Sequence, residues 1–196
     1  MSRIAFFDFD GTITSKDSLV EFIKFALGVF KYYKGLLFLS PILILFKLKF
    51  IPNDLAKEKL ITYFFSGFDS KYFFEIASRY SKDEIPKIVR PKAIEKIIWH
   101  KQAGDKVVIV SASMESWLKC WCNENGVELL GTKLQVEKSK ITGRFSSKNC
   151  YGLEKVHRIK EKYNLDDYKV IYAYGDSMGD QQMLDLAHKK YYKPFN

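Results

Sequence analysis

The stretch Arg3-Ile-Ala-Phe-Phe-Asp8-Phe-Asp10-Gly-Thr12 decides the fold of this chain. In it, a short apolar run ends at two aspartates, a glycine and a threonine. A run of this kind, stopping at a polar turn, is typical of a strand that is buried on both faces of a parallel sheet. Residues 107–111 and 170–176 repeat the pattern, and stretches with helical spacing lie between the runs. We therefore predict an α/β fold built on a parallel sheet.

Polar side chains stand at the ends of all three predicted strands. They are Asp8 and Asp10 after the first strand, Ser111 after the second and Asp176 after the third. In open parallel sheets, ligands bind beyond the carboxyl ends of the strands. The sequence therefore predicts one site that combines these residues.

These residue types suit the transfer of a phosphoryl group. A carboxylate can attack phosphorus to form an acyl-phosphate that water then opens, and Asp8 is the candidate nucleophile. Asp10 is the candidate acid and base, which protonates the leaving oxygen and then activates water. Gly11 permits a sharp turn, and backbone amides there, including that of Phe9, are expected to bind the substrate's phosphate. Thr12 is expected to orient Asp10 and to belong to the same substrate-binding loop.

A phosphate group beside several carboxylates requires positive charge. Lys155 is the candidate residue to supply this charge. The Ser111 hydroxyl and the backbone at Ala112 are expected to donate hydrogen bonds to phosphate oxygens. Carboxylate and carbonyl oxygens are the ligands that Mg²⁺ prefers. We therefore predict a Mg²⁺ site formed by Asp8, the backbone carbonyl of Asp10, Asp176 and, as a further ligand or an anchor, Asp180.

Residues 17–97 interrupt the alternation of strands and helices. They are rich in aromatic residues and mostly helical in pattern, without a strand of the buried type. We predict that they form a helical cap domain inserted into a catalytic core of residues 1–16 and 98–196. Within the core we predict helices at 113–125 (with Ser113 as the N-cap), 153–163 and 181–187, and strands at 129–136 and 141–145.

The motifs resemble, in order and spacing, those of the haloacid dehalogenase (HAD) superfamily. The matching residues are Asp8-Phe-Asp-Gly-Thr12, Ser111, Lys155 and Asp176 with Asp180. The resemblance implies a Rossmann-like core, Mg²⁺, an aspartyl-phosphate intermediate and a cap that closes over the site. In this family, an aspartate at the position of Asp10 accompanies phosphatases. The resemblance therefore implies a Mg²⁺-dependent phosphomonoester phosphatase and argues against dehalogenation.

The place of the insertion, after the first motif, resembles subclass IB, which includes phosphoserine phosphatase. Two motifs depart from that enzyme: Asp10-Gly11-Thr12 stands where it has Asp-Ser-Thr, and Ser111-Ala112-Ser113 where it has Ser-Gly-Gly. Residues 11–19 and 192–195 look more like a bacterial branch that contains phosphatidylglycerophosphate phosphatases. The substrate therefore stays open between a small phosphomonoester and a lipid phosphate at a membrane surface.

Residues 22–53 bear on this alternative, because they contain five lysines and no acidic residue. Residues 36–46, at the centre, are apolar. From the sequence we expect this apolar run to be too short to span a membrane and to be interrupted by Pro41. Lysines around an apolar patch suit the interface of an anionic membrane. The alternative is that these helices pack only on each other and on the core.

Composition narrows the partners and the location. A formal net charge of +9 suits an anionic partner or a solvated basic surface, and without an RNA-binding or helix-turn-helix signature we expect no nucleic acid. The expected partner is a small phosphorylated substrate, with peripheral contact to an anionic membrane as the alternative. Three cysteines and no leader pattern indicate a cytoplasmic protein, with the inner membrane surface as the alternative. A phosphate-binding regulator without turnover is the rival function, although it would not need both Asp8 and Asp10.

Overall fold

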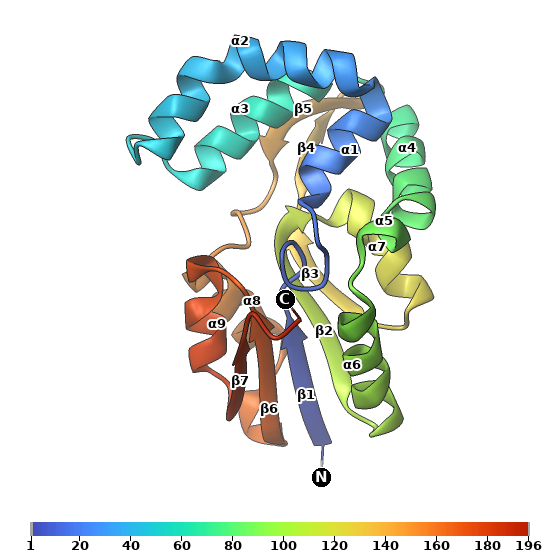
Figure 1. Ribbon diagram of the computed structural model, residues 1–196, viewed down its shortest axis with the longest axis vertical. Helices are drawn as coiled ribbons and strands as arrows, with labels where there is room; N and C mark the ends of the chain where they lie inside the picture. The colour runs from blue at the N-terminus through green and yellow to red at the C-terminus, as the bar shows by residue number, and fades with distance from the viewer. Residues whose placement is uncertain (1, 196) are drawn as a thin grey trace.

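The computed structural model describes residues 2–195 and contains a five-stranded parallel sheet (Figure 1). The strand order is β3 (Glu128–Thr132), β2 (Lys106–Met114), β1 (Ser2–Phe7), β6 (Tyr168–Gly175) and β7 (Lys189–Tyr192). The central strand β1 pairs in parallel with β2 and β6, so the three strands predicted from the sequence are neighbours. The predicted α/β fold with a parallel sheet is confirmed.

The apolar residues of β1 serve two faces of the sheet in alternation, as the period of a strand requires. Ala5 and Phe7 pack in one cluster with α6 (Pro91–Gln102) and α7 (Glu115–Glu124). Ile4 and Phe6 pack in a second cluster with α8 (Leu153–Lys162) and α9 (Gln181–Asp185). This two-sided burial explains why the run is uniformly apolar, and it fixes the direction in which Asp8 leaves the sheet.

Two of the core predictions were wrong in detail. The helix expected at 113–125 begins at Glu115, with Met114 as the N-cap, because Ser113 still belongs to β2. The strand expected at 129–136 is two strands. β3 ends at Thr132, and β4 (Leu134–Glu137) pairs with β5 (Lys140–Phe145) in a separate antiparallel hairpin. The chain leaves the main sheet here, where the Thr132 hydroxyl binds the backbone of Ala112.

Residues 17–97 are helical, and most of them form a layer above the carboxyl ends of the sheet (Figure 1). The helices of this layer are α1 (Ser18–Leu27), α2 (Val29–Lys47), α3 (Asn53–Phe65) and α4 (Ser70–Asp83), followed by the short α5 (Ile85–Ile88). The hairpin β4–β5 lies against α3, where Glu58 accepts a hydrogen bond of 2.7 Å from the Phe145 amide. We call α1–α4 with this hairpin the cap layer. The division at residues 17–97 stays a prediction, but α6 packs on the sheet and the hairpin on the cap helices.

The structure corrects the expectation for Pro41. Helix α2 runs through this proline without a break and is 19 residues long. Proline lacks the N–H that would bond the carbonyl four residues earlier. The Ser40 hydroxyl donates to that carbonyl, of Leu37, at 2.8 Å and so compensates for the missing donor. By length and composition alone, α2 is long enough and apolar enough to cross a membrane. Only 17% of its most apolar 18-residue stretch is buried.

Candidate active site

A buried ion pair lies directly beyond β1. The Nζ atom of Lys155, on α8, is 2.6 Å from Asp8 Oδ1 and 2.6 Å from Asp180 Oδ1. Burial works to lower the pKa of Lys155, but the charges of Asp8 and Asp180 outweigh it and hold that pKa above its ordinary value. Burial also raises the pKa of Asp8 to about 7, against the attraction of Lys155. The positive charge of Lys155 therefore lies directly against the carboxylate of the predicted nucleophile, Asp8.

The carboxylate of Asp10 is held by serines from two elements. It accepts hydrogen bonds from the Ser18 amide at 2.7 Å, from the Ser18 hydroxyl at 3.1 Å and from the Ser113 hydroxyl. Burial, together with the charge of Asp17, raises the pKa of Asp10 to about 6. A carboxyl group in this range can both give and take a proton near neutral pH.

The sequence suggested that Thr12 orients Asp10, but the structure does not show this contact. The Thr12 hydroxyl lies 3.2 Å from Asp8 Oδ2 and 3.1 Å from Asp176 Oδ1 instead. Sequence reasoning missed Ser18 and Ser113 as the residues that hold Asp10. The sequence did hold a signal for Ser113: it lies two residues after Ser111 in the same strand, and residues two apart in a strand point to the same face.

An acidic cluster fits a divalent cation. Oxygen atoms of Asp8, Asp176 and Asp180 lie within 4.8 Å of one another. The single hydroxyl proton of Thr12 faces both Asp8 and Asp176, so it can satisfy only one of these carboxylates at a time. Burial raises the pKa of Asp176, as expected for a carboxylate that has too few donors. The hard oxygen donors and their unbalanced charge suit Mg²⁺.

The members of this cluster have different roles. Asp180 Oδ2 accepts from the Ser177 hydroxyl at 2.7 Å and from the Ser177 amide at 2.9 Å, while its other oxygen binds Lys155. These contacts make Asp180 an anchor for the loop after β6. The side chain of Asp10, included in the predicted metal set through its carbonyl, is held by the serines and lies outside the cluster.

Gly11 is required by the close approach of the first loop to Asp176. Its backbone has a φ of 85°, in the left-handed region that favours glycine. A Cβ atom at this position would overlap the Asp176 carboxylate. The glycine therefore lets the loop after β1 and the loop after β6 meet.

A chamber of about 140 Å³ joins these groups to the cap layer. Ser111 lines it, and its hydroxyl accepts a hydrogen bond of 3.0 Å from the Ser113 amide. Lys57, on α3, brings a cation from the cap and lies 3.3 Å from the Ala112 carbonyl. The residues that line the chamber are Asp8, Asp10, Asp17, Asn53, Lys57, Ser111, Ala112, Tyr151, Lys155, Ser177 and Asp180.

Phe9 and Cys150 do not line this chamber. The Phe9 side chain is buried and packs edge-on against Trp121, with ring centroids 5.3 Å apart, so only its backbone is available to a substrate. Cys150 is buried, and burial raises the pKa of its thiol to about 11. A thiol with this pKa is protonated at neutral pH.

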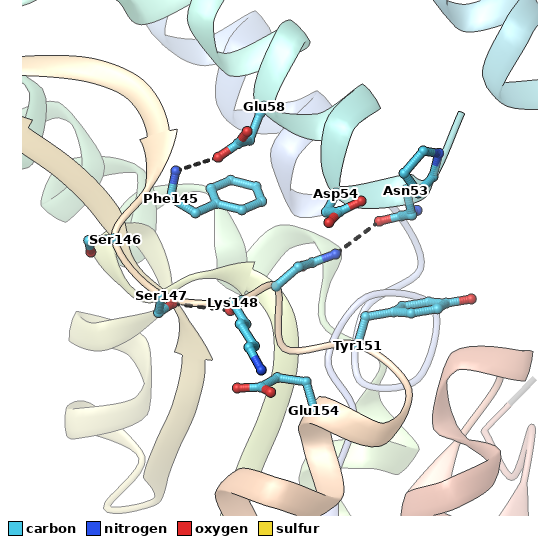
Figure 2. A pocket seen from close by; sticks show the side chains of 11 residues that line it. Asn53, Asp54, Glu58, Phe145, Ser146, Ser147, Lys148, Tyr151 and Glu154 are labelled. Carbon is cyan, nitrogen blue, oxygen red and sulfur yellow. Dashed lines mark hydrogen bonds between the residues drawn. The ribbon is translucent and has the colours of Figure 1, made fainter. Parts of the chain in front are cut away.

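A groove of about 770 Å³ adjoins the chamber, and Asn53 and Tyr151 line both (Figure 2). The Asn149 side chain donates to Asn53 at 3.2 Å, which links the start of α3 to the segment before α8. Asp54, Glu58 and Glu154 give the groove three carboxylates, and Lys148 gives it one ammonium group. No pattern in the sequence indicates this groove, because its walls come from two segments, residues 52–58 and 145–154, that lie far apart in the sequence.

The chain belongs to the family of haloacid dehalogenase-like hydrolases, whose model matches residues 5–185. Protein CicA of Caulobacter vibrioides is 33% identical over 193 residues, which cover 96% of this chain and 85% of that protein. A probable phosphatase of Mycobacterium tuberculosis, Rv3661, is 31% identical over 190 residues, which cover 93% of this chain and 66% of that protein. The family that the motifs implied is confirmed, and the chain is a HAD-type hydrolase.

Solved structures share the fold. A Bordetella pertussis protein of unknown function has a TM-score of 0.84 and 19% identity, with 97% of this chain and 89% of that chain covered. A phosphoserine phosphatase in its apo form has a TM-score of 0.68 and 16% identity, with 98% and 86% covered. At these identities the likeness concerns the fold, and it agrees with the subclass that the inserted segment indicated.

Proposed function

We propose that this protein is a Mg²⁺-dependent phosphatase that hydrolyses a phosphomonoester through a phosphorylated Asp8. The observation that carries the proposal is the pairing of two differently held carboxylates in one chamber. Asp8 is paired with Lys155 at 2.6 Å, while Asp10 is held by Ser18 and Ser113 with a pKa raised to about 6. Family membership and the similarity to a probable phosphatase support the same reaction.

In the first step, an Asp8 oxygen attacks phosphorus while the bond from phosphorus to the ester oxygen breaks. Asp10 gives its proton to that departing oxygen, so the leaving group departs as a neutral alcohol. Lys155 orients Asp8, and the Ser111 hydroxyl with backbone amides of the first loop can donate to the phosphate oxygens. The phosphoryl group then resides on Asp8 as an acyl-phosphate.

In the second step, water attacks the same phosphorus and Asp10 takes a proton from it. The bond between phosphorus and Asp8 breaks, which restores the carboxylate and releases inorganic phosphate. Both steps use one residue as acid and then as base, and a pKa near neutrality suits that double role.

Mg²⁺ would be held by Asp8 and Asp176, with Asp180 fixing the loop that presents Asp176. When bound there, it neutralises the phosphate and lets the carboxylates and the substrate share the chamber. Because Gly11 has no Cβ, the loop after β1 can lie directly against Asp176. Packing of the backbone therefore positions the metal ligands.

The leaving group would extend past Asn53 and Tyr151 into the adjoining groove. The chamber, at about 140 Å³, suits a phosphate group with little beside it, whereas the groove of about 770 Å³ has room for a larger moiety. In this arrangement, α3 and the segment before α8 select the substrate, and the loops of the sheet perform the chemistry.

Release of p-nitrophenol from p-nitrophenyl phosphate, with MgCl₂ or EDTA, tests the proposal. We expect activity with MgCl₂ that EDTA abolishes and that Asp8→Asn reduces by about a thousandfold or more. Acid quenching during turnover should leave one phosphoryl group on the peptide that contains Asp8, detected by mass spectrometry.

Asp185→Asn serves as the matched control, because Asp185 is an exposed carboxylate on α9 away from the chamber. Activity that survives Asp8→Asn would remove Asp8 as the nucleophile. A folded wild-type protein that binds phosphate but shows no turnover on a panel of phosphomonoesters would favour the regulator instead.

A further inference from the structure

Helix α2 exposes an apolar stripe along its outer face. Phe30, Tyr33, Leu37 and Ile44 follow the spacing of one face of a helix, and Phe30 and Leu37 are 82% and 77% exposed. The opposite face, with Tyr32, Gly35 and Leu39, is buried against the cap layer. We call Phe30, Tyr33, Leu37 and Ile44 the outer stripe. It is an unusually long row of large apolar side chains for a surface that meets only water.

The contact of α2 with the rest of the cap is tight, so the outer stripe is not the result of a loosely placed helix. A Cβ at Gly35 would overlap the ring of Phe64 on α3. Tyr32 stacks near the same ring, with centroids 6.4 Å apart. One face of α2 therefore packs against α3, and the other face is presented outward at the top of the molecule (Figure 1).

Lysines border the stripe. The helical repeat of 100° places Lys34 on one flank of the outer stripe and Lys47 on the other. Lys31 and Lys49 add two exposed cations, and none of these four lysines forms an ion pair within residues 2–195. Residues 22–53 contain no acidic residue. An apolar row between unpaired cations is the pattern of a helix that lies in the headgroup region of an anionic bilayer.

The sheet excludes the alternative that α2 spans a membrane. Strand β1 precedes α2, and β2 and β6 come after it, yet β1 lies between these two strands in one sheet. A helix that crosses a bilayer once places the segments before and after it on opposite sides. Both ends of α2 must therefore remain on the same side, and the helix can only lie along the surface.

Charge argues for a bilayer rather than a second copy of the chain. In a twofold dimer the same face meets itself, so the lysines around each outer stripe would approach those of the partner. No acidic residue in 22–53 is available to neutralise them. Anionic headgroups supply that charge.

We propose that the outer stripe of α2 and its bordering lysines dock the protein on the surface of an anionic membrane, with the helix parallel to the bilayer. The C-terminal end of this surface leads to the site: Lys49 and the 74%-exposed Phe50 lie just before Asn53, which lines the chamber. A docked molecule would hold the cap against the lipid and the sheet away from it. The proposal does not depend on turnover.

Flotation with vesicles of phosphatidylcholine, alone or mixed with an equal part of phosphatidylglycerol, tests the proposal. We expect binding to the mixed vesicles only. Changing Lys31, Lys34, Lys47 and Lys49 together to Glu should weaken it by about tenfold or more. The control changes four exposed lysines elsewhere to Glu, with the same loss of charge, and should bind nearly as the wild type: Lys71, Lys92, Lys119 and Lys160.

A second pair of variants tests the apolar part. Leu37→Ser with Ile44→Ser should also weaken binding to the mixed vesicles, whereas Ile98→Ser with Val136→Ser, at exposed apolar positions outside α2, should not. The elution volume and circular dichroism spectrum of each variant establish that it is folded.

Three results would overturn the proposal. The first is equal binding of the wild type to both kinds of vesicle, and the second is an equal loss in the two fourfold lysine variants. The third is a dimer in solution that Leu37→Ser with Ile44→Ser dissociates while the wild type fails to float with vesicles. That result would assign the outer stripe to a second copy of the chain.

Discussion

The Ser113 hydroxyl, at the end of β2, donates a hydrogen bond to Asp10 Oδ2, beyond the end of β1. This bond ties the proposed acid and base to the neighbouring strand. Ser18 holds the same carboxylate from α1, and the Ser18 and Ser113 hydroxyls are themselves 3.0 Å apart. The direction of Asp10 is therefore set jointly by the sheet and by the first cap helix.

Ser113→Ala should lower kcat for p-nitrophenyl phosphate by roughly tenfold with little change in KM, because Asp10 loses a donor that positions it for proton transfer. Ser113→Thr should retain most of the activity, since the hydroxyl remains. The control is Ser116→Ala, at a hydroxyl on α7 with no hydrogen-bond partner within residues 2–195. An unchanged kcat in Ser113→Ala would show that Ser18 alone positions Asp10.

Gly11→Ala should raise the Mg²⁺ concentration needed for half-maximal activity by about tenfold or more, because its Cβ would displace the Asp176 carboxylate. Gly67→Ala is a matched control, since Gly67 has a φ of 86° but nothing near its would-be Cβ. The two variants share the backbone strain, so only the clash distinguishes them. Titration of activity with MgCl₂ makes the measurement, and equal curves for the two variants would contradict the assignment of Asp176.

Lys57→Met should weaken inhibition by inorganic phosphate by about tenfold and raise KM, because the chamber loses the only lysine that the cap layer contributes to its lining within residues 2–195. Lys59→Met, two residues further along α3 and exposed, should leave both constants near those of the wild type. Steady-state kinetics with phosphate as the inhibitor gives the two values. Similar constants for Lys57→Met and the wild type would place phosphate binding entirely on the core.

Acid should destabilise the protein through His100, which is buried between Asp105 (2.7 Å) and the Tyr174 hydroxyl (2.9 Å). Burial lowers the pKa of His100 from 6.5, even though Asp105 works to raise it. The unfolded chain therefore binds the proton more readily, so His100 favours the folded state above pH 6.5 and loses this contribution as the pH falls toward its folded pKa.

Urea unfolding of the wild type and His100→Gln at pH 7.5 and 5.5 measures this effect. The free energy of unfolding should fall more on acidification in the wild type than in the variant. Asp8 and Asp10, with raised pKa values, act in the opposite sense but are common to both proteins. An identical decrease in the two proteins would rule out His100 as the group that titrates.

The sequence predicted the parts of this molecule that depend on short-range patterns. The apolar run before Asp8 predicted a buried strand, and the polar residue at the end of each such run predicted where the site lies. Contacts that depend on the closure of distant segments left no such pattern. Ser18 and Lys57 reach the chamber only because α1 and α3 pack above the sheet.

The sequence pattern also failed to predict two places where a neighbouring group changes the local structure. Pro41 predicted a break, but Ser40 supplies a donor for the carbonyl that the proline leaves free. The strand expected at 129–136 divides after Thr132 because its second half pairs with β5 and not with the main sheet. In both places the local structure depends on a contact that the sequence pattern does not include: the Ser40 hydroxyl in the first and strand β5 in the second.

The attachment of the hairpin β4–β5 to α3 constrains how the molecule can move. Within residues 2–195, the chain passes between the sheet and the cap layer four times, near residues 14, 89, 133 and 146. The first two crossings are bonded to each other, with the Arg90 amide 2.8 Å from the Ile13 carbonyl, and the hairpin is fastened to α3 at Glu58. Four anchored crossings leave fewer degrees of freedom than a two-stranded hinge. Substrate entry would then proceed by a small rocking of the whole upper layer, not by one flap swinging open.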